Sequence, residues 1–358
     1  MFTWSENPIN DLWNHIRFFG KRVNCKRLLL GEIDSGRKIH YTEGPDLDKK
    51  VNQISMCINQ ASEYFTAAHQ VSINTSPLLL FYGMLSLAKA LIVANKRDIF
   101  LEDIKYHGLY TRPIDDELLK YRDNPKNWTM EQEYAITNDG VFKHFTEIVD
   151  KFTFENGSII KFKNILSICP EISAMYEKYY DEASKTLPLY SFKKISDEPI
   201  KIMLAFNVKN ENEVYIRFPE FRNDFDLAPD LLHEQARQFI SKDLSDYPNY
   251  IDRFQPVVGG DYVVGYLEYD VNNTNKKHVI NQALADYIAM YILSLCVRYK
   301  QDFWGSVVNG EKTGILGLIE LYISVIKRRY PNIILDLLVG EKFRYGSPAY
   351  LGGPLLKF

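Results

Sequence analysis

The sequence has few cysteines, and those it has stand far apart. The four are Cys25, Cys57, Cys169 and Cys296, and no two of them form a Cys-x-x-Cys pair. Such a pair is typical of a structural zinc site or a redox-active dithiol. We therefore expect no metal site of this kind and no cofactor. The four residues are predicted to be buried free thiols in a reducing compartment.

Signals for export and for membrane insertion are also missing. The N-terminus has neither the basic nor the apolar region of a secretory signal peptide. The longest apolar run, from Pro77 to Val93, contains Lys89 and falls short of the ~20 residues that span a bilayer. The formal net charge is -3, from 43 basic and 46 acidic residues, which gives no overall attraction to nucleic acid or anionic membranes. These absences predict a soluble cytoplasmic protein with no membrane partner.

Several common catalytic motifs are incomplete or missing. His233-Glu234 does not continue into His-Glu-x-x-His, because Arg237 stands where the second histidine would be. Gly259-Gly260 and Gly352-Gly353 do not belong to a phosphate-binding glycine motif, and no Gly-x-Ser-x-Gly elbow occurs. The sequence therefore gives no support to a zinc hydrolase, a P-loop enzyme or a serine hydrolase, and the glycine pairs are predicted to be turns.

The sequence does contain strong helical patterns. Apolar residues spaced three and four apart predict a helix over 47–70: Val51, Ile54, Ile58, Ala61, Phe65 and Ala68. Ser76-Pro77 is a good helix start, and the following run to about residue 94 is apolar on nearly every side, which predicts the most buried element of the protein. Further helices are expected over 7–19, 170–182, 228–244, 281–300 and 316–329, with Pro331 as a stop or a kink.

Strands are expected mainly in the middle of the chain, within 156–168 after a turn at Asn156-Gly157, over 200–206 and 214–218, and on both sides of Gly259-Gly260. The predicted fold class is α+β, predominantly α-helical, with a small antiparallel sheet in the middle of the chain. We divide the chain into three regions. Residues 1–150 form an N-terminal helical region with the 76–94 core helix, 151–275 a mixed region with short strands, and 276–358 a C-terminal helical region that packs back on the first.

Four stretches, in the same order along the chain, resemble the YaaC-like family of bacterial proteins. They are the run from Ser76 to Ala90, His107-Gly108-Leu109 with Thr111-Arg112, Gly140-Val141-Phe142 with Phe145, and Arg298-Tyr299 with Trp304. The N-terminal Glu6-Asn7-Pro8 is similar too. The resemblance implies a bacterial intracellular protein. It implies no reaction, because the family is uncharacterised.

His107 and Arg112 are the candidate catalytic residues. A histidine titrates near neutral pH and an arginine stabilises anionic charge, so the pair suits phosphate binding or acid–base chemistry. Alternatively, His107 binds a backbone carbonyl and Arg112 pairs with a carboxylate. A HEPN-like ribonuclease would place the arginine before the histidine on one helix. Here the order is reversed, and Gly108 and Pro113 oppose a continuous helix.

Lys89 and Tyr82 are the candidate ligand-binding residues. A lysine within an apolar helix has to reach solvent, pair with an acid or lose its charge. Lys89 is therefore either a contact for an anionic ligand or a residue at the exposed edge of its helix. Lys327-Arg328-Arg329 closes a predicted helix, where cations suit the negative helix end. It could instead join Arg298 and Lys300 in a nucleic-acid patch.

The absence of a complete catalytic motif favours a regulatory or interaction component that acts with a protein partner or a second copy of the chain. Bacterial stress or antiphage defence is the setting we consider for it. The alternative is an RNA- or nucleotide-directed enzyme that uses His107 and Arg112, either a HEPN-like ribonuclease or a nucleotide-binding effector. Convergence of His107, Arg112 and Lys89 in one concave pocket would favour this alternative.

Overall fold

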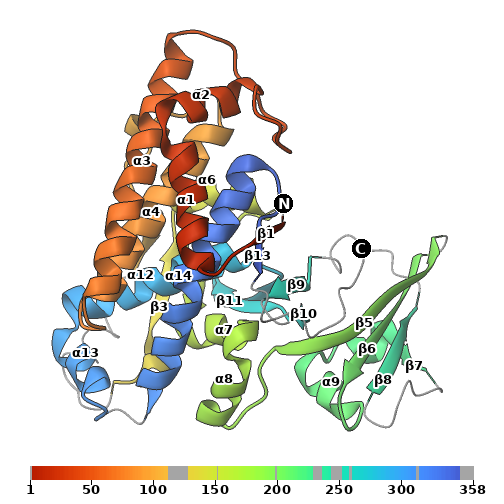
Figure 1. Cartoon of the computed structure of the whole chain (residues 1–358). Coiled ribbons are helices and arrows are strands. Elements are labelled where there is room, and N and C mark those ends of the chain that lie inside the picture. Colours follow the sequence, from red (N-terminus) through yellow and green to blue (C-terminus); the bar gives the residue numbers. More distant parts are fainter. Residues whose placement is uncertain are drawn as a thin grey trace.

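The computed structural model describes residues 2–111, 128–150, 152–197, 200–228, 236–242, 252–257, 260–311 and 314–346. Its mainly helical α+β class is the predicted one. The expectation of one small sheet is wrong, because the strands form sheets of two, five and six strands. Figure 1 shows most helices gathered together, with the six-stranded sheet beside them. Arg112, His233-Glu234, Gly259 and Gly352-Gly353 lie outside the described residues.

Four helices form the N-terminal part: α1 (Pro8–Gly20), α2 (Arg22–Leu30), α3 (Pro45–Gln70) and α4 (Ser76–Asn95). The helices predicted at 7–19, 47–70 and 76–94 are confirmed within one or two residues. Every apolar position of the stripe that predicted α3 is buried. This stripe packs on α4, which lies alongside α3 (Figure 1).

The C-terminal helices are α12 (Gln282–Tyr299), α13 (Gln301–Val308) and α14 (Ile315–Val339). Both α12 and α14 contact α4, so helices from the two ends of the chain share one hydrophobic core. Every residue from Gln282 to Cys296 is buried. The most deeply buried helix is therefore α12, whereas α4, for which we expected this place, keeps a partly exposed face. The division of the chain into three regions stays a prediction.

Helix α14 continues through Pro331, where the sequence predicted a stop or a kink. Proline removes one backbone N–H but leaves the helical φ angle available. Ile334, Leu335 and Leu338 follow it and are buried against the core, which favours continuing the helix. The helix ends at Gly340, which has the left-handed φ of 79° that suits a glycine C-cap.

An antiparallel sheet of five strands flanks the helical core, in the order β12-β11-β4-β3-β2. Its strands are β2 (Leu109–Tyr110), β3 (Tyr134–Thr137), β4 (Ile159–Lys161), β11 (Leu267–Val271) and β12 (Thr274–His278). Shorter elements around it are α6 (Val141–Val149), α7 (Phe162–Ser167), α8 (Ser173–Tyr180) and the 3₁₀ turns η1 (Leu101–Asp103), η3 (Met130–Gln132) and η4 (Pro170–Ile172). A parallel pair, β1 (Phe2–Trp4) and β13 (Arg344–Gly346), joins segments near the two chain ends.

The six-stranded sheet has a second hydrophobic core of its own. Its strand order is β7-β8-β6-β5-β10-β9. The bounds are β5 (Thr186–Asp197), β6 (Ile200–Asn207), β7 (Phe225–Leu227), β8 (Ala236–Ser241), β9 (Phe254–Val257) and β10 (Gly260–Val264). Two short helices cover it, α9 (Asn212–Arg217) and α10 (Phe221–Asp224). The strands predicted at 200–206 and on both sides of Gly259-Gly260 belong to this sheet.

Two predicted elements in this region are wrong. Residues 214–218, expected to be a strand, lie mostly in α9, where Val214 and Phe218 are one helical turn apart and both buried. The helix predicted over 228–244 is strand β8 across its described part. There Phe239 packs on Phe206 of β6, with ring centroids 5.9 Å apart. Pairing with β6 and β7 on both sides overrides the weak helical pattern.

Helix α4 is also the one helix, among the described residues, long and apolar enough to cross a membrane. The most apolar window of this helix is 72% buried inside the protein. This burial is consistent with the core helix of a soluble protein. All four cysteines are free and buried, as predicted.

Two buried cations bind the carbonyl groups at the C-terminal end of α4. Lys50 donates from Nζ to the carbonyl oxygens of Val93, Lys96 and Ile99, at 3.3, 2.8 and 2.7 Å. Arg37 donates to the carbonyl oxygens of Ala94 at 2.6 Å and Leu338 at 2.7 Å. The negative end of the α4 dipole is therefore compensated from inside the protein.

The chain around Arg37 fits tightly against the end of α14. Gly36 lies so close to Gly340 that a Cβ atom on Gly36 would stand 2.1 Å from the Gly340 carbonyl oxygen. Only glycine leaves room for this contact between two backbones.

Candidate functional site

One face of α4 is only partly buried, and it starts at the helix N-terminus. Leu78, Tyr82, Leu85 and Lys89 follow one another at helical spacing and are each of intermediate exposure. Tyr82 stacks on Tyr64 of α3, with ring centroids 5.7 Å apart. Lys89 has no hydrogen bond or ion pair with any other described residue. This face therefore carries both ligand-binding candidates, Tyr82 and Lys89, on a single strip.

His107 lies just before β2 and packs against the main hydrophobic core. Its ring packs against Tyr291 at 5.0 Å and Phe81 at 6.2 Å between centroids. Its carbonyl oxygen accepts a 2.9 Å hydrogen bond from the Tyr287 hydroxyl. Its Nδ1 accepts the backbone N–H of Leu109 at 3.4 Å, so Nε2 carries the proton of the neutral ring. Nε2–H is thus a donor, and it has no acceptor within the described part of the chain.

Two basic side chains, Arg298 and Lys89, lie close enough to this imidazole to act on its charge. Burial lowers the pKa of His107 below its ordinary value of 6.5, and the positive charges of Arg298 and Lys89 lower it further. No carboxylate among the described residues acts on the pKa of His107. Arg298 also acts on the neighbouring Tyr291, whose pKa burial raises to about 12. We call Lys89, His107 and Arg298 the cationic cluster.

Arg298 connects this cluster to a pocket. It lies in the last turn of α12, where its Nε and Nη2 donate to the carbonyl and hydroxyl oxygens of Ser294, both at 3.2 Å. Its Nη1 has no partner within the ranges that the structure describes. The pocket has a volume of about 480 Å³ and lies between the start of α4, the end of α12 and α13. Its lining residues are Asn74, Thr75, Leu78, Val297, Arg298, Gln301, Trp304 and Gly305.

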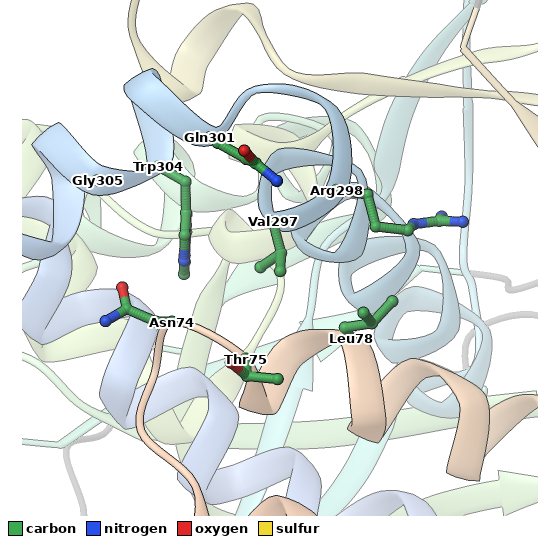
Figure 2. A pocket seen from close by; sticks show the side chains of 8 residues that line it. All are labelled: Asn74, Thr75, Leu78, Val297, Arg298, Gln301, Trp304 and Gly305. Atoms are coloured by element: carbon green, nitrogen blue, oxygen red, sulfur yellow. The ribbon is translucent and has the colours of Figure 1, made fainter.

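The two ends of this pocket differ in chemistry. Figure 2 shows Trp304 and Asn74 at one end and Arg298 at the other, with Leu78 and Val297 between them. Trp304 is only 3% exposed, yet its indole Nε1 has no hydrogen-bond acceptor in the described structure. A buried N–H without an acceptor is rare in folded proteins.

The positive end of the α4 dipole opens onto the same pocket. Thr75, the N-cap residue, makes no side-chain capping bond. Helices α2, α3 and α13 also begin without such a bond, whereas Asn7 of α1 and Asn281 of α12 each accept a backbone N–H through the side chain. An uncapped helix start favours negative charge nearby.

A family model described as YaaC-like Protein matches residues 18–338. The chain belongs to the YaaC-like family. No curated protein and no solved structure matched it. The matched YaaC-like region contains both the cationic cluster and the pocket.

The sequence of this YaaC-like chain identified only part of the site. His107, Lys89 and Tyr82 were candidates, and the structure places His107 and Lys89 close enough for their charges to interact. Arg112 lies outside the described residues. The pocket residues Asn74, Gln301 and Trp304 were not candidates. Arg298 and Trp304 did belong to a stretch that resembled the family, which was the available signal.

The basic residues that we weighed as a nucleic-acid patch are dispersed. Arg329 is buried and donates to both Asp286 carboxylate oxygens, at 2.6 and 3.1 Å, and to Glu171 at 2.6 Å. Lys300 is buried and pairs with Glu133 at 2.6 Å. Arg328 pairs with Glu171 at 3.4 Å, and Lys327 donates to the Ala68 carbonyl oxygen at 3.5 Å. These four cations are compensated inside the YaaC-like fold, which leaves Arg298 as the member of that group that reaches the site.

Proposed function

We propose that this YaaC-like protein is a regulatory component that binds a small phosphate-bearing ligand at the cationic cluster. The observation that carries the proposal is that Arg298 and Lys89 both act on the charge of the half-buried His107, while no carboxylate in the described structure does so. Two buried cations elsewhere in the described structure, Arg329 and Lys300, pair with carboxylates. Two others, Lys50 and Arg37, bind several backbone carbonyl oxygens at a helix end. Basic side chains gathered with no carboxylate beside them favour a bound anion.

The donors of the cluster suit phosphate oxygens. Arg298 offers the free Nη1, Lys89 its ammonium, and His107 its Nε2–H. A phosphate monoester carries about two negative charges near neutral pH and three acceptor oxygens. Its charge would offset the mutual repulsion of Lys89 and Arg298 and would raise the pKa of His107 from its lowered value.

The regulatory part of the proposal rests on where the ligand would lie. Its contacts would join α4, α12 and the segment before β2, three elements of the main core. Ligand binding would thus stabilise one arrangement of these elements, which a partner can sense. We propose a protein partner or a second copy as the sensor, in the bacterial cytoplasm, with stress or antiphage defence as the setting.

The alternative, an RNA- or nucleotide-directed enzyme, has one observation in its favour. The lowered pKa keeps His107 neutral near pH 7, as a general base requires. The hydrogen bond from Leu109 to Nδ1 opposes this role, because it makes Nε2 a donor. If the chain cleaves RNA and His107→Ala abolishes the cleavage, the enzyme replaces the regulatory component.

Calorimetric titration with inorganic phosphate and pyrophosphate tests the proposal. Wild type should bind, and Arg298→Gln and Lys89→Gln should each weaken binding about tenfold or more, because each removes a charge-assisted hydrogen bond. Lys49→Gln is the matched control, since Lys49 lies in α3, pairs with Glu102 and does not act on the charge of His107. The proposal fails if wild type binds neither anion, or if the cluster variants bind as Lys49→Gln does.

A further inference from the structure

We propose that the pocket between α4, α12 and α13 receives the nucleoside part of a nucleoside 5′-monophosphate whose phosphate lies at Arg298. This inference rests on the proposed phosphate site and names the rest of the ligand. It starts from the shape of the pocket, which has a cation at one end and neutral hydrogen-bonding groups at the other (Figure 2). A ligand that fits both ends has an anionic group and a neutral polar group, separated by a less polar part.

Trp304 determines what the neutral end of the ligand has to offer. An indole Nε1–H is a donor only, so it requires an acceptor. Trp304 is only 3% exposed, and its Nε1 has no acceptor in the described structure. Leaving such a group unpaired costs about 1–3 kcal/mol, so a ligand acceptor at this position would gain affinity from pairing with it.

The other residues at this end match the edge of a nucleobase. Asn74 and Gln301 are exposed at the pocket mouth, and their amides each offer a donor and an acceptor. Side-chain amides of this kind pair with the donor and acceptor atoms along a base edge. Every nucleobase also has a ring nitrogen or carbonyl oxygen that could accept the Trp304 N–H.

The middle of the pocket and its size fit the same ligand. Val297 and Leu78 line the pocket between Trp304 and the Arg298 guanidinium (Figure 2) and provide apolar contact for a flat ring. The volume of about 480 Å³ lies within the range of roughly 300–1,000 Å³ that small-molecule sites occupy. A free phosphate ion would use only the Arg298 end and would leave Trp304 unpaired.

The test compares AMP, GMP, CMP and UMP with inorganic phosphate by calorimetric titration. At least one nucleotide should bind wild type about tenfold or more tightly than phosphate does, since it adds the base contacts. Trp304→Phe keeps a buried ring but removes the donor. It should weaken binding of that nucleotide about fivefold to tenfold and leave phosphate binding unchanged. Trp13→Phe, in α1, is the matched control and should change neither affinity.

Gln301→Ala is the second variant, because it alters an exposed side chain that folding does not need. It should weaken binding of the nucleotide severalfold and leave phosphate binding unchanged. The inference is overturned if phosphate binds and all four nucleotides bind no more tightly. It is also overturned if Trp304→Phe, shown to be folded by its thermal transition, and Gln301→Ala both bind the nucleotide as wild type does. Loss of phosphate binding by wild type would instead remove the proposed phosphate site itself.

Discussion

Asp336, in the last turn of α14, is a carboxyl group that holds its proton unusually well. It accepts the backbone N–H of Phe343 at 2.8 Å and the side-chain N–H of Asn332 at 3.2 Å. Burial raises the pKa of this carboxyl from 3.8 to about 7, although the Phe343 hydrogen bond and nearby positive charges oppose the rise. The folded chain therefore binds a proton at Asp336 between these two values, where the unfolded chain does not.

A pH dependence of stability follows from this difference. A raised carboxyl pKa adds stability below the unfolded value, and this stability is lost as the pH rises through the folded value. The free energy of unfolding of wild type should thus fall relative to that of Asp336→Asn between pH 3.8 and about 7, and the difference should stay constant above that. Urea unfolding at several pH values measures it. Parallel curves for the two proteins would contradict the prediction.

At the scale of elements, the contact between α3 and α4 depends on a glycine. A Cβ atom on Gly83 would stand 2.7 Å from Phe65 Cδ2 and 3.2 Å from Tyr64 Cβ. Phe65 is 1% exposed and lies in the main core, so its ring has little room to move. The two helices can approach this closely only because position 83 has no side chain.

We expect Gly83→Leu to lower the free energy of unfolding by about 1–3 kcal/mol through overpacking. Gly83→Ala should also destabilise the protein, although alanine favours helices. Gly317, in α14, is the matched control, because a Cβ atom there would meet nothing within 4 Å. Gly317→Ala should stabilise by about 0.5–1 kcal/mol. Urea unfolding compares the three variants, and equal effects of alanine at both positions would refute the packing argument.

The long helices were predictable because their patterns are local. The stripe on α3 and the Ser76-Pro77 start of α4 each lie within a few turns of one chain segment. Several strands were predictable too, but their assembly into three sheets was not, since pairings such as Asp270 with Ile159 join distant segments through strands of three to five residues. The site shows the same limit. His107 and Lys89 could be singled out by residue type, whereas the meeting of Leu78 with Val297 depends on the packing of α4 on α12.

At the scale of the whole molecule, the described residues form two hydrophobic cores. The larger one unites the helices and the five-stranded sheet, and it supports the cationic cluster. The smaller one lies between the six-stranded sheet, α9 and α10. Proteins with separate cores often open in separate cooperative units.

Replacing a large side chain of the smaller core by alanine should therefore leave phosphate binding at the site unchanged. Phe206, fully buried on β6, contacts Phe218, Phe221 and Phe239. Phe206→Ala should destabilise its unit by about 3–5 kcal/mol. Hydrogen exchange should then speed up in β5, β6 and β8 but not in α4 or α12, and phosphate affinity should be unchanged. Phe65→Ala, in the larger core, is the reverse control. Faster exchange throughout the chain in both variants would contradict the independence of the units.

The contact of Arg37 with two helix ends limits how the protein can be shortened. Residues 31–44, between α2 and α3, form neither helix nor strand. A chain shortened to begin at α3 would therefore lose no secondary structure from this segment. Removing that segment would take away the guanidinium that binds the carbonyls of Ala94 and Leu338, and the backbone that fits against Gly340. The ends of α4 and α14 would then be exposed together. A shortened form of this protein therefore has to begin before Ser35 to keep both helix ends covered.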